Sequence, residues 1–172
     1  MGDVQTKATR TSIELVQCFS PAQDVASQAR VALILDGHLL GQQVVFSYYD
    51  LPLAFSSLPA WGPSSGGTLI DLIGRGFPAI ASIRCRFHMN GEVGRLVLAQ
   101  RLNSQHIQCA CPEASTLGAS LLEYSLNSQQ FSRTGQLFRF DEPISLKAVS
   151  PQSGNPAGGT HVDFTGSNVI SQ

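Results

Sequence analysis

The sequence predicts an all-β chain built from repeated units, and three observations support this prediction. Only 13% of the 172 residues are charged, while 16 glycines and 9 prolines interrupt the chain. A typical soluble domain holds roughly 25% charged residues, and frequent turn residues suit short strands better than long helices. The apolar runs are short and often alternate with polar residues, as half-buried strands require. Finally, a set of landmarks recurs after 91 or 92 residues.

The repeat is clearest in a Gln-Cys-x-x-Pro pattern, which occurs at residues 17–21 and again at residues 108–112. The Gly-Gly-Thr sequence of residues 66–68 recurs at residues 158–160, and Asp71 and Gly74 recur as Asp163 and Gly166. Such periodicity indicates tandem domains. It predicts one complete domain at residues 53–143, the C-terminal part of a preceding domain at 1–52, and the N-terminal part of a following domain at 144–172.

Within residues 53–143, seven short apolar segments are candidate strands. They are residues 53–55, 68–73, 83–87, 95–99, 106–109, 121–126 and 135–140. Alternation in the third segment places Ile83, Cys85 and Phe87 on one face, and it places Arg84, Arg86 and His88 on the other. Seven strands separated by turn residues in about 90 residues are typical of an immunoglobulin-like β-sandwich.

A family resemblance strengthens this prediction. Residues 59–68 read Pro-Ala-Trp-Gly-Pro-Ser-Ser-Gly-Gly-Thr, and an alternating strand and a Gly-x-Gly-Phe turn follow. They resemble the opening of an IPT/TIG domain, Pro-x-x-Gly-Pro-x-x-Gly-Gly-Thr, and residues 151–160 repeat this opening. Residues 85–87, 107–112 and 125–127 resemble internal landmarks of the same family. The resemblance covers nearly the whole chain and implies an immunoglobulin-like fold of the E-set type. It is specific for the fold and says little about function.

The resemblance also implies a disulfide between Cys85 and Cys109, because related domains often hold a bridged pair at these positions. Such a bridge would indicate an oxidising compartment. The alternative, two buried thiols that act as small hydrophobic residues, stays open. Cys18 has no equivalent of Cys85 to pair with, and we expect Cys111 on the other face of its strand. The one-residue spacing of Cys109 and Cys111 argues against zinc.

Charge and chemistry exclude several classes of function. A net charge of -1, with no run of basic residues, gives no reason to expect nucleic-acid binding, and no apolar stretch is long enough to insert into a membrane. We expect no catalytic residues, no metal site and no cofactor. The histidines are isolated in sequence, and the acidic residues of the complete domain are expected to be solvated: His38, His88, His106, His161; Asp71, Glu92, Glu113, Glu123. Arg84, Arg86 and His88 form the clustered cationic face, which we interpret as solvated rather than as a ligand site.

We therefore predict a module that is not an enzyme and that serves for binding, adhesion or spacing in a larger multi-IPT/TIG protein. The resemblance implies a cell-surface or receptor-like ectodomain, as in plexin-like and fibrocystin-like proteins. Its expected partners are a protein or glycan ligand and the neighbouring IPT/TIG-like domains. An accessory sandwich of a carbohydrate-active enzyme and a dimerisation module of an intracellular transcription factor are the alternatives. We expect an extracellular location, although the first residues lack the apolar core of a signal peptide.

The two end pieces together lack only the equivalents of residues 81–91. We expect them to be unfinished halves with open strand edges. Head-to-tail complementation between successive chains is the less favoured alternative, because the missing piece supplies a core strand.

Overall fold

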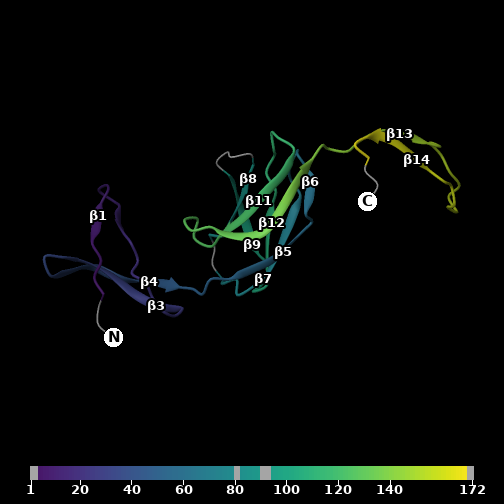
Figure 1. The fold of residues 1–172 in the computed structure, drawn as a ribbon. Coiled ribbons are helices and arrows are strands. Elements are labelled where there is room, and N and C mark those ends of the chain that lie inside the picture. Colours follow the sequence, from purple (N-terminus) through teal and green to yellow (C-terminus); the bar gives the residue numbers. More distant parts are fainter. Residues whose placement is uncertain (1–3, 80–81, 90–93, 170–172) are drawn as a thin grey trace. The chain divides into compact units, whose positions relative to one another are not determined.

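The structure is a computed structural model that describes residues 4–79, 82–89 and 94–169, and the elements in these residues are all strands (Figure 1). The chain divides into two compact units, Met1–Leu51 and Pro52–Gln172. Each unit is described by itself. The expectation of an all-β, immunoglobulin-like chain is confirmed.

The first unit consists of two hairpins. Strand β1 (Ala8–Arg10) pairs with β2 (Val16–Cys18), and β3 (Ser27–Leu35) pairs with β4 (His38–Tyr48). The second hairpin turns at Asp36 and Gly37, whose φ angles are 50° and 80°. Two consecutive positive φ angles are the signature of the tight turn that matches the twist of paired strands. The Asp-Gly sequence therefore turns the chain where the sequence predicts.

The second unit contains the central sandwich, which we define as the eight strands from β5 to β12. Their bounds are β5 (Leu53–Leu58), β6 (Trp61–Pro63), β7 (Leu69–Arg75), β8 (Arg84–His88), β9 (Arg95–Arg101), β10 (His106–Ala110), β11 (Gly118–Ser125) and β12 (Ser132–Asp141). The hydrogen-bonded order is β5-β7-β10-β9-β8-β11-β12-β6. Strand β9 links the two layers, because its first half pairs with β8 and its second half pairs with β10.

The core lies between the two layers and is filled by aliphatic and aromatic side chains. Phe87, Phe138 and Phe140 pack edge to face, with ring centroids 5.0 to 6.1 Å apart. Phe77 packs in the same manner on Tyr124 from the other layer, at 5.7 Å. The aliphatic residues buried with them are Ile70, Leu72, Ile83, Ile107 and Leu122. Edge-to-face contacts are a favourable arrangement for aromatic rings, so the inward residues of the alternating strands pack together in the core.

Three glycines explain the opening motif and the strand that follows it. Gly66 and Gly67 have φ angles of 80° and 84°, which other residues adopt only with strain. Gly74 lies directly against the carbonyl oxygen of Leu53, and a Cβ there would come within 2.8 Å of the Phe77 ring. The motif therefore serves turn geometry and close strand packing.

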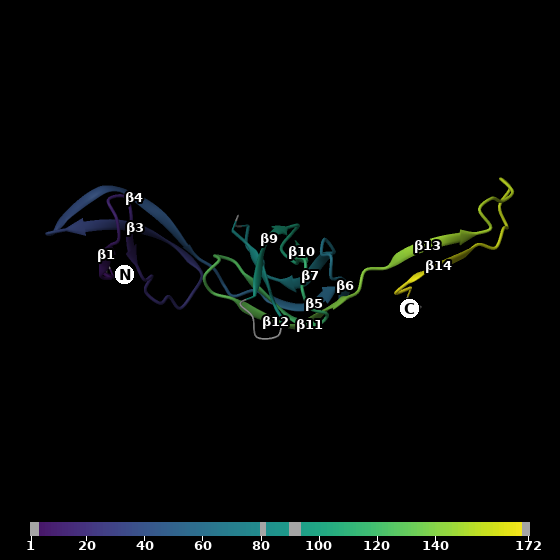
Figure 2. The ribbon, with the colours of Figure 1, turned by 90° about the horizontal axis from the view of Figure 1, so that it is seen from above.

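A last hairpin follows the central sandwich, formed by β13 (Ser145–Ser150) and β14 (Asp163–Ser167), which lie side by side (Figure 2). Its pairing register equals that of β5 and β7 displaced by 92 residues. Leu53 pairs with Arg75 and Ser145 pairs with Ser167, while Leu58 pairs with Asp71 and Ser150 pairs with Asp163. The irregularity between Ala54 and Ser56 recurs between Leu146 and Ala148.

The hairpins of the first unit also share their registers with the central sandwich. Ala8 pairs with Cys18 as Ala99 pairs with Cys109. Leu33 pairs with Leu40 as Tyr124 pairs with Ser132, across a bulge that both hairpins contain. Backbone pairing in these hairpins thus follows the same displacement of 91 or 92 residues as the sequence landmarks.

The seven predicted strands are present, although several extend beyond their predicted ends. An eighth strand, β6, was not predicted. It is three residues long, contains Gly62 and Pro63, and pairs in parallel with β12. Neither residue favours strands, and the pairing joins segments far apart in sequence, so local pattern could not reveal it.

Candidate functional site

The outer face of the layer that contains β8 holds the cationic residues singled out in the sequence. Strand β8 alternates as predicted: Cys85 and Phe87 are fully buried, while Arg84, Arg86 and His88 point outward and are half-buried. Strand β11 pairs with β8 and places Glu123 opposite Arg86.

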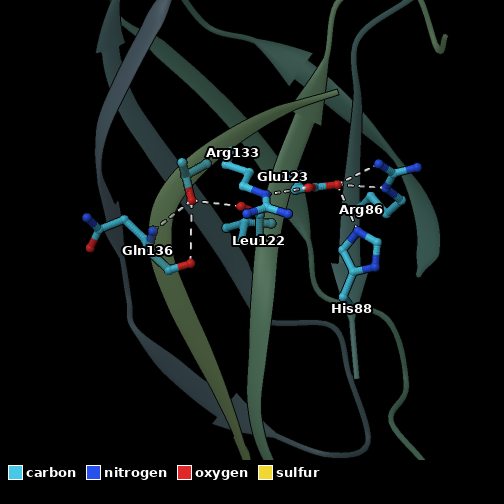
Figure 3. A network of polar contacts seen from close by, with 7 residues as sticks. Arg86, His88, Leu122, Glu123, Arg133 and Gln136 are labelled. Atoms are coloured by element: carbon cyan, nitrogen blue, oxygen red, sulfur yellow. Dashed lines mark hydrogen bonds and ion pairs between the residues drawn. The ribbon is translucent and has the colours of Figure 1, made fainter. Parts of the chain in front are cut away.

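Glu123 is the centre of a polar cluster on this face (Figure 3). Its Oε2 atom accepts hydrogen bonds from Arg86 Nη2 at 2.6 Å and Arg86 Nε at 2.9 Å, and it lies 2.8 Å from His88 Nε2. The other carboxylate oxygen lies 3.6 Å from Arg133 Nε. The Arg86 guanidinium lies 3.6 Å from the centre of the Phe131 ring, a cation–π distance. The carboxylate is therefore enclosed by three side chains.

This enclosure sets the protonation of Glu123. Burial raises the pKa of the carboxyl, because the ionised form loses water. The hydrogen bonds and charges of His88 and Arg86 outweigh burial and bring the pKa of Glu123 below its ordinary value. The glutamate is thus ionised at neutral pH and compensates the positive charge of Arg86.

The prediction that Glu123 is solvated is wrong: its exposed fraction is 6%. Glu123 lies outward on its strand, as a polar residue should, but the neighbouring strands β8 and β12 bring three side chains around it. The cationic face is present, but its interpretation as simple solvated side chains needs correction. Arg86 and His88 both contact Glu123. Arg84, the third residue of the predicted cationic face, does not contact it.

Exposed apolar residues lie beside the cluster on the same outer face. The pairing of β8 with β9 places Leu96 next to Arg86 and Leu98 next to Arg84, and both leucines are exposed. Leu137 of β12, opposite Leu121, is also exposed. This outer face therefore exposes leucines next to arginines.

Cys85 of β8 and Cys109 of β10 meet across the core and form a disulfide, with Cα atoms 6.4 Å apart. The bridge joins the two layers. Cys111 is buried, so the expectation that it lies on the opposite face from Cys109 is wrong. Residues two apart on a strand share a face, and Cys111 follows Cys109 in that way while its N–H donates to the Thr68 carbonyl at 2.8 Å.

The remaining predicted residues do not gather into a site. Asp71 accepts a hydrogen bond from Gln108 at 2.8 Å on the outside of the other layer, and Glu113 is exposed. His38 lies in the first unit, His106 lies on β10, and His161 is 3.6 Å from Asp163. Glu92 is outside the described residues.

Two further kinds of site were sought in the described part of the chain. Its residues include no group of three or more His, Cys, Asp or Glu side chains that could hold a metal ion. Nor do they form a helix long and apolar enough to cross a membrane.

Two antiparallel layers, a strand that links them and a core disulfide between them define an immunoglobulin-like β-sandwich. Comparison with known proteins makes the assignment specific. The model of the IPT/TIG domain matches residues 54–140, and the chain belongs to this family.

Solved structures support the fold. Two structures of the plexin A4 full extracellular region are similar to this chain, each at 15% sequence identity. The match to the first has a TM-score of 0.58 and covers 85% of this chain and 13% of the plexin chain. The match to the second has a TM-score of 0.50 and covers 79% of this chain and 14% of the plexin chain. This chain therefore spans about an eighth of the length of these structures.

Proposed function

We propose that the chain is a non-catalytic binding or spacer segment of a larger extracellular protein with several IPT/TIG domains. It presents rigid sandwiches in series, and its ligand contacts exposed strand faces or loops. We expect the protein or glycan ligand to contact the exposed surface of leucines and arginines around Arg84 rather than to enter a deep pocket.

The repeated registers support the multidomain part of this proposal. Hairpins β1–β2 and β3–β4 pair as β9–β10 and β11–β12 do, and β13–β14 pairs as β5–β7 does. Matching registers, with register shifts at or within one residue of the equivalent place, are expected when the same fold recurs along a chain, since bulges are conserved within families. Residues 1–52 and 144–172 are accordingly proposed to be parts of further IPT/TIG-like domains.

The disulfide between Cys85 and Cys109 is the observation that carries the extracellular assignment. Both cysteines lie in the core, where two layers meet, and disulfides form and persist in oxidising compartments and are rare in the cytosol. An intracellular module of this fold would be expected to keep these residues as thiols. Plexin A4, whose extracellular region is similar in fold, is the precedent for such a location.

The redox state of these cysteines tests the proposal. The full chain would be produced in the secretory pathway of cultured cells, denatured in an alkylating reagent without reduction, and digested for mass spectrometry. We expect a peptide pair linked through Cys85 and Cys109, with Cys18 and Cys111 alkylated. Alkylation of Cys85 and Cys109 in most molecules would contradict the extracellular assignment. Protein made in the cytoplasm and treated in the same way is the matched control and should show four alkylated cysteines.

A further inference from the structure

The outer face of the layer that contains β8 carries more positive than negative side chains. We define the arginine–leucine face as the outward residues of β8, β9, β11 and β12. Its charged members are Arg84, Arg86, Arg133, Arg139, Glu123 and Asp141. With His88 counted as neutral, these side chains sum to a charge of +2, whereas the whole chain carries -1. This face is therefore positive in a chain that is slightly negative.

The two carboxylates of the arginine–leucine face are already paired with its own cations. Glu123 is 6% exposed and is enclosed by Arg86, His88 and Arg133 (Figure 3). Asp141 accepts hydrogen bonds from Arg139 at 2.8 and 3.1 Å. A basic partner would have to displace these cations to reach either carboxylate. The face is therefore complementary in charge to an acidic partner.

Arg84 is the arginine of this face that is available to such a partner. It is half-buried, and among the described residues no Asp or Glu side chain lies within salt-bridge distance of it. Its neighbours on the paired strands are Leu98 of β9 and Ser125 of β11, neither of which is charged. Arginine binds a carboxylate through two parallel hydrogen bonds, which gives both strength and direction. Arg84 is therefore suited to pair with a carboxylate from outside the chain.

Exposed leucines border the arginines of β8 on one side. Leu96 and Leu98 alternate along β9, are 54% and 67% exposed, and lie opposite Arg86 and Arg84. Neighbouring strands are about 4.8 Å apart, so an apolar row lies directly beside a row of guanidinium groups. A sulfated glycan would neutralise the arginines but would leave both leucines in water, whereas a protein can also bury the leucines. The combination favours a protein partner.

We propose that the arginine–leucine face binds a protein segment in which carboxylate side chains stand beside apolar ones. Arg84 pairs with a carboxylate of the partner, and an apolar side chain of the partner covers Leu98. This inference rests on the proposed binding function and names the chemistry of its ligand. The hydrogen bonds to Glu123 hold Arg86 in place before the partner arrives, which lowers the entropy cost of binding.

Selection from a library of random short peptides tests the chemistry of the partner. The library would be displayed on phage and selected at physiological salt on the full chain, produced in the secretory pathway of cultured cells. We expect the enriched peptides to contain more Asp and Glu than the starting library, together with Leu, Ile or Phe. Enriched peptides without an excess of acidic residues, or no enrichment over the bare surface, would overturn the proposal.

Matched substitutions decide whether the enriched peptides bind this face. In fluorescence polarisation with the labelled peptides, Arg84→Glu and Leu98→Ser should each weaken binding by about tenfold or more. Arg75→Glu and Leu69→Ser are the controls and should bind as the wild type does, because both residues are exposed on β7 in the other layer. Equal affinities of Arg84→Glu and Arg75→Glu would contradict the proposal.

The fold of the variants is checked by urea unfolding. Leu98 is exposed, so Leu98→Ser should unfold at the wild-type midpoint when followed by the fluorescence of Trp61 in the central sandwich. Loss of peptide binding in a variant with an unchanged midpoint then reports on the surface itself. Full binding by Leu98→Ser at an unchanged midpoint would refute the apolar part of the proposal.

Two other occupants give different results. Binding of heparin that Arg84→Glu abolishes, without any selection of acidic peptides, would assign the face to an anionic glycan and overturn the proposal. Self-association in sedimentation that Arg84→Glu abolishes and Arg75→Glu does not would assign the face to a second copy, with the same consequence. A linked peptide pair of Cys85 and Cys109 together with a failed peptide selection would refute this inference and leave the extracellular assignment standing.

Discussion

Reduction of the disulfide between Cys85 and Cys109 should destabilise the central sandwich by several kcal/mol. The two residues are 24 positions apart in sequence. In the chain-entropy description, closing a loop of about 25 residues lowers the conformational entropy of the unfolded state, which stabilises the folded domain by about 3.5 kcal/mol at 25 °C. Reduction changes no other side chain, so the comparison isolates the crosslink from the loss of packing that a substitution would add.

Urea unfolding followed by tryptophan fluorescence measures this effect. Trp61 is the one tryptophan in the chain and lies in β6, so its emission reports on the central sandwich. A domain of about 90 residues has an m-value of about 1.3 kcal/mol/M in urea, and the midpoint should therefore fall by about 2.5 M on reduction.

Two variants control for other effects of the reductant. Cys18→Ser removes an exposed free thiol and keeps the disulfide, so it should match the wild-type midpoint under both conditions, including the fall of about 2.5 M on reduction. A double variant with alanine at positions 85 and 109 should be insensitive to reductant and at least as unstable as the reduced wild type. Reduced and oxidised wild type with midpoints within about 0.5 M would refute the reasoning, because a 25-residue crosslink must constrain the unfolded chain by more than this.

Three substitutions test the rest of the central sandwich by the same urea titration. Glu123→Gln should lower the free energy of unfolding by about 1 to 2 kcal/mol at pH 7. Since the pKa of Glu123 is lowered, this difference in stability between wild type and variant should persist above about pH 5 and vanish as the pH falls through that pKa. A constant difference down to pH 3 would contradict this reasoning. Gly74→Ala should cost about 1 to 3 kcal/mol, because its Cβ meets the Leu53 carbonyl and the Phe77 ring; a neutral effect would show that the strands separate freely. Phe87→Ala should cost about 3 to 5 kcal/mol through the cavity left among the core rings, and a loss under 1 kcal/mol would contradict its central place.

The strands were predictable where local pattern decides them. Alternation in residues 83–88 assigned the inward and outward side chains of β8, and the Asp36-Gly37 turn follows from residues that tolerate positive φ. Strand β6 was not predicted, because it forms only by pairing with β12, whose Phe140 lies opposite Gly62 although the two residues are far apart in sequence.

The polar cluster was only half predictable. Arg86 and His88 could be placed on one face from alternation, but Glu123 lies 37 and 35 residues away from them in sequence. Which residue of β11 faces Arg86 depends on strand register, and a shift by one residue would move Glu123 to the core side. Burial of the carboxylate, and with it the lowered pKa, follows from that register.

The sequence by itself determined the all-β character, the recurrence of landmarks after 91 or 92 residues and the resemblance to the family, because turn residues, alternation and recurring motifs are local properties that survive in a one-dimensional pattern. Only the tertiary structure decided between the bridge of Cys85 and Cys109 that the resemblance implies and two buried thiols, and only it showed that Glu123 is enclosed by Arg86 and His88. These features depend on which strands become neighbours and in what register. That choice is made by packing between distant segments, since burying the shared core is what brings the two layers together.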